Sequence, residues 1–126
     1  MRKILFKAKT ISDSKWVRGS LIKTPFGTFI EWYENSICNK RGVDPSTVCQ
    51  FIGLKDVNGE ELYENDIITA KTTLDIELKG KIIYLNACYF LGIMDEQGRD
   101  KAIRELWRLV DICRKGSALD KEDNHE

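Results

Sequence analysis

Residues 43–68 read VDPSTVCQFIGLKDVNGEELYENDII, and this stretch carries the clearest strand and turn signals of the chain. Val48–Leu54 is an apolar run of strand length. The pair Asn58-Gly59 follows it, and this pair is typical of two-residue hairpin loops, because a type I′ turn needs two successive positive φ values. Leu62-Tyr63 and Ile67–Ala70 are two further short apolar runs. The stretch therefore predicts short antiparallel strands joined by tight turns.

Two more local structures are predicted inside this stretch. Asp44 is placed to cap a single helical turn that Pro45 opens at its first position. Asn65 tolerates the left-handed conformation better than most non-glycine residues, which suits a turn before the next strand.

The chain on either side of this stretch continues the β pattern. Pro25 and Gly27 provide turn chemistry between two β-rich runs and so predict a hairpin. From residue 34 to residue 47 the apolar pattern lapses, which predicts a loop. Many short strands at turn spacings of roughly 8–12 residues predict a mainly β fold, a small barrel or a sandwich, with an α+β fold as the alternative. The other expected strands lie at residues 4–9, 16–22, 28–33, 81–85 and 87–94.

The segment 103–113 fits two interpretations. Ile103, Leu106, Trp107 and Val110 repeat at helical spacing and predict a buried helix face, with Arg104, Glu105, Arg108 and Asp111 turned outward. Leu109 and Ile112 suit a strand equally well, so a helical turn that leads to a closing strand is the other interpretation. Beyond Gly116 the chain is polar and is expected to be frayed.

Composition limits the classes of function. The chain has 126 residues, 42% of them hydrophobic, which suits one domain or two very small ones. Twenty basic and twenty acidic residues cancel, which argues against binding driven by a global positive field. Residues 1–50 nevertheless hold nine Lys/Arg against four Asp/Glu, and residues 51–79 hold three against seven. Either these two parts complement each other, or the basic part faces a polyanion.

The expected compartment is the cytoplasm. No apolar run approaches the roughly 20 residues that span a bilayer, and the apolar part of the start is too short for a signal peptide. The four cysteines form no Cys-x-x-Cys pair, so they are expected to be buried free thiols and not metal ligands.

Nothing in the sequence points to catalysis, so the chain is expected not to be an enzyme and to need no cofactor or metal. His125 is the single histidine, and it lies in the polar tail. No phosphate-binding loop, dinucleotide fingerprint or His-Glu-x-x-His helix occurs. Five carboxylates lie close together in the sequence and would raise one another's pKa if they converged, but a hairpin directs alternate side chains to opposite faces, which favours a role in the turns. They are Asp56, Glu60, Glu61, Glu64 and Asp66.

Residues 43–68 resemble the signature of the YopX-like family, small proteins of phages and bacterial prophages, whose pattern reads like VDPxTVxQYTGLKDKNGKxIYEGDIV. Residues 2–8 resemble that family's REIKFRAW start, and Gly80–Tyr84 resembles its GxVxY strand. The resemblance implies a mainly β fold whose second half is an SH3-like small barrel, with no catalytic residue and no assigned biochemical role. Asn65 stands where glycine is usual, and residues 107–113 lack the family's usual ending.

The resemblance and the pattern together predict three parts. Residues 1–50 form an N-terminal β-hairpin region, packed on an SH3-like barrel region over residues 51–115 that carries a short C-terminal helical segment. Residues 116–126 form a polar tail.

Two functions are compatible with this sequence. The preferred one is a protein-interaction module that binds another protein or a second copy of itself, because small β domains must cover their exposed strand edges. The alternative is a nucleic-acid-binding barrel that uses aromatic and basic side chains of the N-terminal region. The same alternation of aromatic and basic residues would also arise if the aromatic side chains formed a core and the lysines beside them faced solvent. The candidate nucleic-acid-binding residues are Lys15, Trp16, Arg18, Trp32, Lys40 and Arg41.

Overall fold

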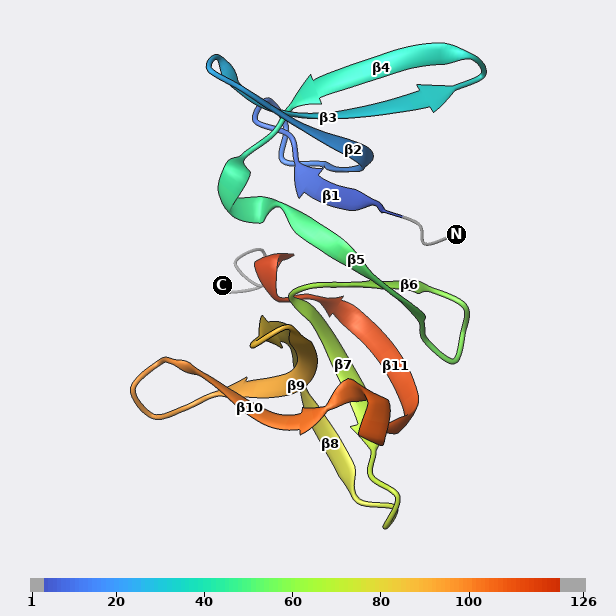
Figure 1. Ribbon diagram of the computed structural model, residues 1–126, viewed down its shortest axis with the longest axis vertical. Coiled ribbons are helices and arrows are strands. Elements are labelled where there is room, and N and C mark those ends of the chain that lie inside the picture. The colour runs from blue at the N-terminus through green and yellow to red at the C-terminus, as the bar shows by residue number, and fades with distance from the viewer. Residues whose placement is uncertain (1–3, 121–126) are drawn as a thin grey trace. The chain divides into compact units, whose positions relative to one another are not determined.

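The computed structural model describes residues 4–120, and the chain divides between Gly53 and Leu54 into two compact units. The predicted boundary between residues 50 and 51 lies within a strand, β5. Strands hold 64% and helical turns 8% of the described residues, so the predicted mainly β class is confirmed. The elements of the first unit are β1 (Phe6–Lys9), β2 (Trp16–Thr24), β3 (Gly27–Glu34), β4 (Ile37–Gly42), the 3-10 turn η1 (Pro45–Thr47) and β5 (Cys49–Lys55). Figure 1 shows them in blue to green.

The first unit is an antiparallel sheet in the order β4-β3-β2-β1-β5. Its core contains Ala8, Ile30 and Val43, none of which is exposed to solvent. Ala8 faces this core, and the alternation of a strand directs Lys7 and Lys9 to the opposite face. The strand expected over residues 4–9 is present as β1, although Lys7 and Lys9 are buried as well as Ala8, and the predicted hairpin of β2 and β3 is confirmed.

The loop expected over residues 34–47 is wrong, because β4 occupies its middle. This strand pairs with β3 and is an edge of the sheet, and most of its residues are exposed. An edge strand that buries neither face lacks the hydrophobic alternation by which strands are recognised in a sequence. The turn predicted after it is correct: Asp44 caps η1 by accepting a hydrogen bond of 3.0 Å from the backbone N–H of Ser46.

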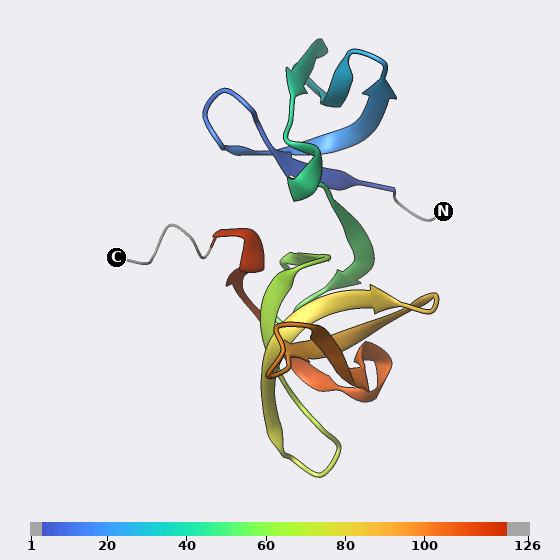
Figure 2. The ribbon, with the colours of Figure 1, turned by 90° about the vertical axis from the view of Figure 1, so that its left-hand side faces the viewer.

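The second unit contains the strand order β10-β9-β8-β7-β11, again antiparallel throughout. It buries Ile68, Ile82 and Leu91, and its sheet coils strongly in both views (Figures 1 and 2). Within the described chain β10 and β11 end the strand order and no pairing joins them, so the sheet is not a closed barrel. The elements of the second unit are β6 (Glu61–Tyr63), β7 (Asp66–Lys71), β8 (Glu77–Leu85), β9 (Cys88–Met94), β10 (Asp100–Glu105), the 3-10 turn η2 (Leu106–Arg108) and β11 (Val110–Ser117).

Two glycines allow close contact between strands of the second unit. A Cβ on Gly80 of β8 would lie 2.4 Å from the carbonyl oxygen of Gly92 on β9, and a Cβ on Gly92 would lie 2.7 Å from the Ile83 side chain. Neither residue has a positive φ, so the requirement is for space and not for an unusual backbone conformation.

The turn at Asn58-Gly59 joins β5 to β6 as expected, but it is not the predicted type I′ turn. Only Gly59 has a positive φ, of 84°, whereas Asn58 does not. The backbone N–H of Gly59 donates to the carbonyl of Asp56, and that of Asp56 donates to the carbonyl of Glu60. This is a right-handed turn followed by one left-handed glycine, the usual form of a three-residue hairpin loop. The expectation for Asn65 is confirmed, with a φ of 70°.

Segment 103–113 follows the second of its two interpretations. The helix is only the three-residue turn η2, and β11 follows it as a strand that pairs with β7. Leu106 is buried, but Trp107 is 72% exposed and Val110 is 47% exposed, so the predicted buried face of four residues is wrong. A single turn can direct only one of these side chains inward. β11 continues to Ser117, and residues 121–126 of the expected frayed tail lie outside the described residues.

Candidate functional site

The basic and aromatic candidates at the start of β2 contact residues of their own unit. Trp16 pairs with Lys9 and Arg18 with Lys7 across β1 and β2. The ammonium groups of Lys7 and Lys9 lie 4.5 and 5.5 Å from the centre of the Trp16 ring, as cation–π contacts. Both lysines are buried, at 1% and 8% exposure. The indole is therefore a packing partner for the lysines of β1.

Lys15 and Arg41 lie near a carboxylate. Lys15 precedes β2, Arg41 lies on β4, and both are exposed. The pKa of Asp13 is lowered first by a hydrogen bond from the Thr10 hydroxyl and further by the charges of Arg41 and Lys15. This carboxylate offsets part of the positive charge that the sequence places here.

The other two candidates point to different faces of the sheet. Trp32 packs against the core of the first unit, which agrees with the interpretation that the aromatic residues of this region form a core. Lys40 pairs with Glu31 and its ammonium lies 5.3 Å from the Phe29 ring centre. Because neighbouring residues of a strand alternate, Lys40 shares a face with Trp16 and Arg18, whereas Arg41 shares the face of Trp32. The structure therefore does not bring the six candidates together on one surface.

Asp56 organises the turn between β5 and β6. Its Oδ1 accepts hydrogen bonds from the backbone N–H groups of Asn58 and Glu60, at 2.8 and 2.9 Å, and its Oδ2 accepts one of 2.8 Å from the backbone N–H of Arg114. These bonds favour the ionised form, so the pKa of Asp56 is lowered, most strongly by the bond from Arg114. The carboxylate thus joins its own turn to β11.

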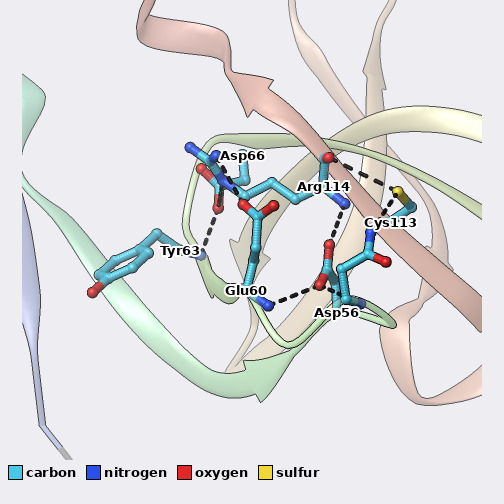
Figure 3. Close-up of polar contacts among 7 residues, drawn as sticks. Asp56, Glu60, Tyr63, Asp66, Cys113 and Arg114 are labelled. Carbon is cyan, nitrogen blue, oxygen red and sulfur yellow. Dashed lines mark hydrogen bonds and ion pairs between the residues drawn. The ribbon is translucent and has the colours of Figure 1, made fainter.

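Asp66 is the second carboxylate of the signature, and it is fully buried. Its Oδ2 accepts a bond of 2.9 Å from the backbone N–H of Tyr63 and another of 2.9 Å from Nε of Arg114. The Nη1 of Arg114 also lies 3.6 Å from the carboxylate of Glu60. Figure 3 shows Arg114 between the two aspartates, its backbone toward Asp56 and its guanidinium toward Asp66.

This network has the geometry of a structural clamp. Both carboxylate oxygens of Asp56 and Oδ2 of Asp66 accept hydrogen bonds from backbone or guanidinium N–H groups. Such bonds stabilise a buried charge. The role of Arg114 could not be predicted from the sequence, because Asp66 and Asp56 lie 48 and 58 positions away and no local pattern spans that separation. Between residues 4 and 120 no three His, Cys, Asp or Glu side chains lie close enough to hold a metal ion.

The cysteines follow the expectation in part. All four are free thiols. Cys49 is buried and Cys88 and Cys113 are half-buried, but Cys38 is exposed on the edge strand β4.

A groove of about 400 Å³ lies in the second unit, between the turn that joins β7 to β8 and the segment that leads from η2 into β11. Leu74 and Ile76 come from the turn and are 81% and 54% exposed. Trp107 and Val110 come from the other side and are 72% and 47% exposed. Such a group of large apolar side chains is typical of a site that another molecule covers.

The turn of this groove has the construction of the Asp56 turn. The backbone N–H of Thr72 donates to the carbonyl of Ile76, and the Thr72 hydroxyl accepts from the N–H groups of Leu74 and Ile76. Asp75 takes the left-handed position, with a φ of 65°. These bonds occupy the turn's N–H groups, so a ligand here would contact mainly side chains.

The opposite wall supplies the positive charge of the groove. Arg104 lies one residue before the end of β10 and Arg108 ends η2, and no acidic side chain of residues 4–120 lines the groove beside them. The guanidinium of Arg108 lies 5.1 Å from the centre of the Trp107 ring and 3.7 Å from the Glu105 carboxylate. The groove is therefore apolar along its length and cationic on one side.

A family model described as YopX protein matches residues 5–114. The chain belongs to the YopX family. The match includes both units, and so both the Asp56–Arg114–Asp66 network and the groove beside Trp107 lie within the YopX region. Comparisons with curated proteins and with solved structures found no match. The part of this YopX chain that the structure describes has no helix long and apolar enough to cross a membrane.

Proposed function

We propose that this YopX protein is a phage- or prophage-encoded accessory protein of the bacterial cytoplasm, and that it acts without catalysis as a protein-interaction module. The groove between residues 72–76 and 104–110 would be its binding surface. The observation that carries this proposal is the exposure of Trp107 beside Leu74 and Ile76. Large apolar side chains grouped in a concave site are the usual anchors of protein recognition.

The architecture of the second unit supports the same proposal. Four strands follow one another as neighbours, from β7 to β10, and β11 returns after a 3-10 turn to pair with β7. We infer that this is an SH3-like small barrel in which the strand order remains open between β10 and β11. In such an arrangement the loop after β7 and the 3-10 turn lie at one end of the unit, where side chains from both can line one site.

The clamp around Arg114 supports a non-catalytic role. Asp56 and Asp66 accept hydrogen bonds that hold a turn and a strand together, and Asp66 is fully buried. A general base needs a polar atom within reach of the substrate proton, which a buried and hydrogen-bonded carboxylate does not offer.

The proposal is tested with a library of random dodecapeptides displayed on phage and selected on the immobilised full chain. We expect enriched peptides whose binding is lost in the Trp107→Ala and Leu74→Ser variants and kept in Phe26→Ala. Phe26 is a matched control because it is 93% exposed and lies in the other unit, on the turn between β2 and β3. Failure of any peptide to be enriched, or enrichment that persists in Trp107→Ala, would contradict the proposal.

The same protein is titrated with a fluorescent dT20 oligonucleotide and with a 20-base-pair duplex at 50 and 200 mM salt. We expect no binding in the micromolar range. Salt-sensitive binding that is lost in Lys15→Glu/Arg18→Glu would instead favour the nucleic-acid function, because phosphate contacts weaken steeply as salt rises.

A further inference from the structure

We infer that the groove beside Trp107 takes a short protein segment in which an apolar anchor side chain lies next to one or two carboxylates. This inference rests on the proposed function, because it names the chemistry of the partner for the same groove. It follows from the charge, the apolar lining and the internal hydrogen bonds of the groove.

The charge of the lining selects an acidic partner. Among the described residues, the two charged ones that line the groove are Arg104 and Arg108. Four acidic residues are adjacent in sequence to the lining, and none of them lines the groove itself: Asp75 pairs with Lys71 at 3.6 Å and Glu105 with Arg108 at 3.7 Å, and the other two are Glu77 and Asp111. Exposed pairs of this length contribute little stability, so a partner carboxylate can replace Glu105 on Arg108 at small cost. A guanidinium offers two parallel N–H donors to a carboxylate, which a single point charge does not.

Arg104 is available for the same role. It is exposed, and its Nη1 donates a bond of 3.1 Å to the backbone carbonyl of its neighbour Ile103. That contact uses one of the five N–H donors of the guanidinium and holds the side chain along the end of β10. A carboxylate that enters the groove can thus meet one arginine on β10 and another on η2.

The apolar lining favours a protein segment over nucleic acid. Leu74, Ile76, Leu109 and Val110 are aliphatic, and aliphatic side chains match other apolar side chains better than they match the polar edges of bases. Trp107 is the one aromatic ring that the described part of the chain places in the groove, and Arg108 already lies over it at 5.1 Å. Proteins that bind single strands offer several rings in succession to successive bases. The protein also has a net charge of zero, so it lacks the global positive field that attracts a polyanion.

The experiment uses the peptides selected on the full chain as described above, with their dissociation constants measured by fluorescence anisotropy. We expect the selected sequences to be enriched in Asp or Glu within three positions of Leu, Ile, Phe or Trp. Arg104→Glu and Arg108→Glu should each weaken binding at least fivefold. Peptides with the selected carboxylates changed to lysine should bind the Arg104→Glu/Arg108→Glu variant better than they bind the unchanged protein.

Arg99→Glu is the matched control and should leave the affinity unchanged, because Arg99 is an exposed arginine of the turn between β9 and β10 that does not line the groove. If peptides are selected that require Trp107 but carry no acidic residues, the inference is overturned while the proposed function stands. If no peptide is selected, both fail. Competition of a dT10 oligonucleotide for the peptide site would overturn the inference in favour of nucleic acid.

Discussion

The Nε–H of Arg114 donates to Oδ2 of Asp66 at 2.9 Å, and the carboxylate that receives it is fully buried. The same arginine donates its backbone N–H to Asp56. One residue of β11 therefore holds both the turn that precedes β6 and the start of β7. Because β11 is the last strand of the second unit along the chain, this contact forms only when the end of the unit returns to the strands at its start.

Removal of the guanidinium should be the most damaging single change in the clamp. Arg114→Met removes the guanidinium donor from the buried Asp66 carboxylate, which still accepts from the backbone N–H of Tyr63, and we expect a loss of about 3 kcal/mol in the free energy of unfolding. Urea unfolding followed by circular dichroism measures this loss. The control is Arg99→Met, whose pair with Asp95 is exposed and should contribute less than about 1 kcal/mol. Equal losses in the two variants would show that Asp66 does not depend on Arg114.

The contribution of Asp56 should depend on pH. Its folded-state pKa lies below the unfolded value of 3.8, so its stabilisation is fully present above about pH 5 and is lost as the pH falls through the folded-state pKa. In Asp56→Asn the amide NH₂ faces the N–H of Arg114, and we expect a loss of about 1–3 kcal/mol at pH 7. The difference between the two proteins should shrink toward pH 2, as urea titrations at several pH values would show.

Asp95→Asn is the matched control for Asp56→Asn. Asp95 makes the same two turn bonds, to the N–H groups of Gln97 and Arg99, but no third bond to a distant strand is described. We expect a smaller loss at pH 7 than for Asp56→Asn. If Asp95→Asn lost as much stability as Asp56→Asn, the whole effect at Asp56 would come from the bonds within the turn and none from the contact with β11.

A methyl group on Gly80 should destabilise the second unit. It would lie 2.4 Å from the carbonyl oxygen of Gly92, so β8 and β9 must separate, and we expect a loss of about 1–3 kcal/mol. Gly98→Ala is the comparison, because its φ of 81° strains an alanine by about 1 kcal/mol while nothing lies within 4 Å of the new methyl group. Thermal unfolding should therefore give a lower midpoint temperature for Gly80→Ala than for Gly98→Ala. The reverse order would contradict the close approach of the two strands.

Truncation of two tryptophans should have different effects on stability. Trp32 packs on the core of the first unit, and Trp32→Ala should lose about 2–3 kcal/mol in the free energy of unfolding. Trp107 is 72% exposed, and Trp107→Ala should stay within about 0.5 kcal/mol of the unchanged protein. Urea unfolding of both variants makes the comparison. A stable Trp32→Ala variant would restore Trp32 as a candidate for base stacking.

The turns and the strand class could be predicted from the sequence because each depends on neighbours in the chain. Asp44-Pro45 opens η1, and Asn65 takes the left-handed position, as their own conformational preferences require. The form of the Asn58-Gly59 turn could not be predicted. Asp56 there accepts two N–H groups of the turn and a third from Arg114, and this favours a right-handed turn over the mirror-image one.

Local patterns were sufficient to predict that this YopX chain is built of short antiparallel strands, because alternation and turn chemistry act over a few residues. The structure was needed to show that β4 exists, that Trp107 faces outward and Trp32 inward, and that Arg114 neutralises a buried aspartate. Each of these depends on which strands become neighbours. That choice rests on the sum of many contacts between residues far apart in the chain, so no segment carries it alone.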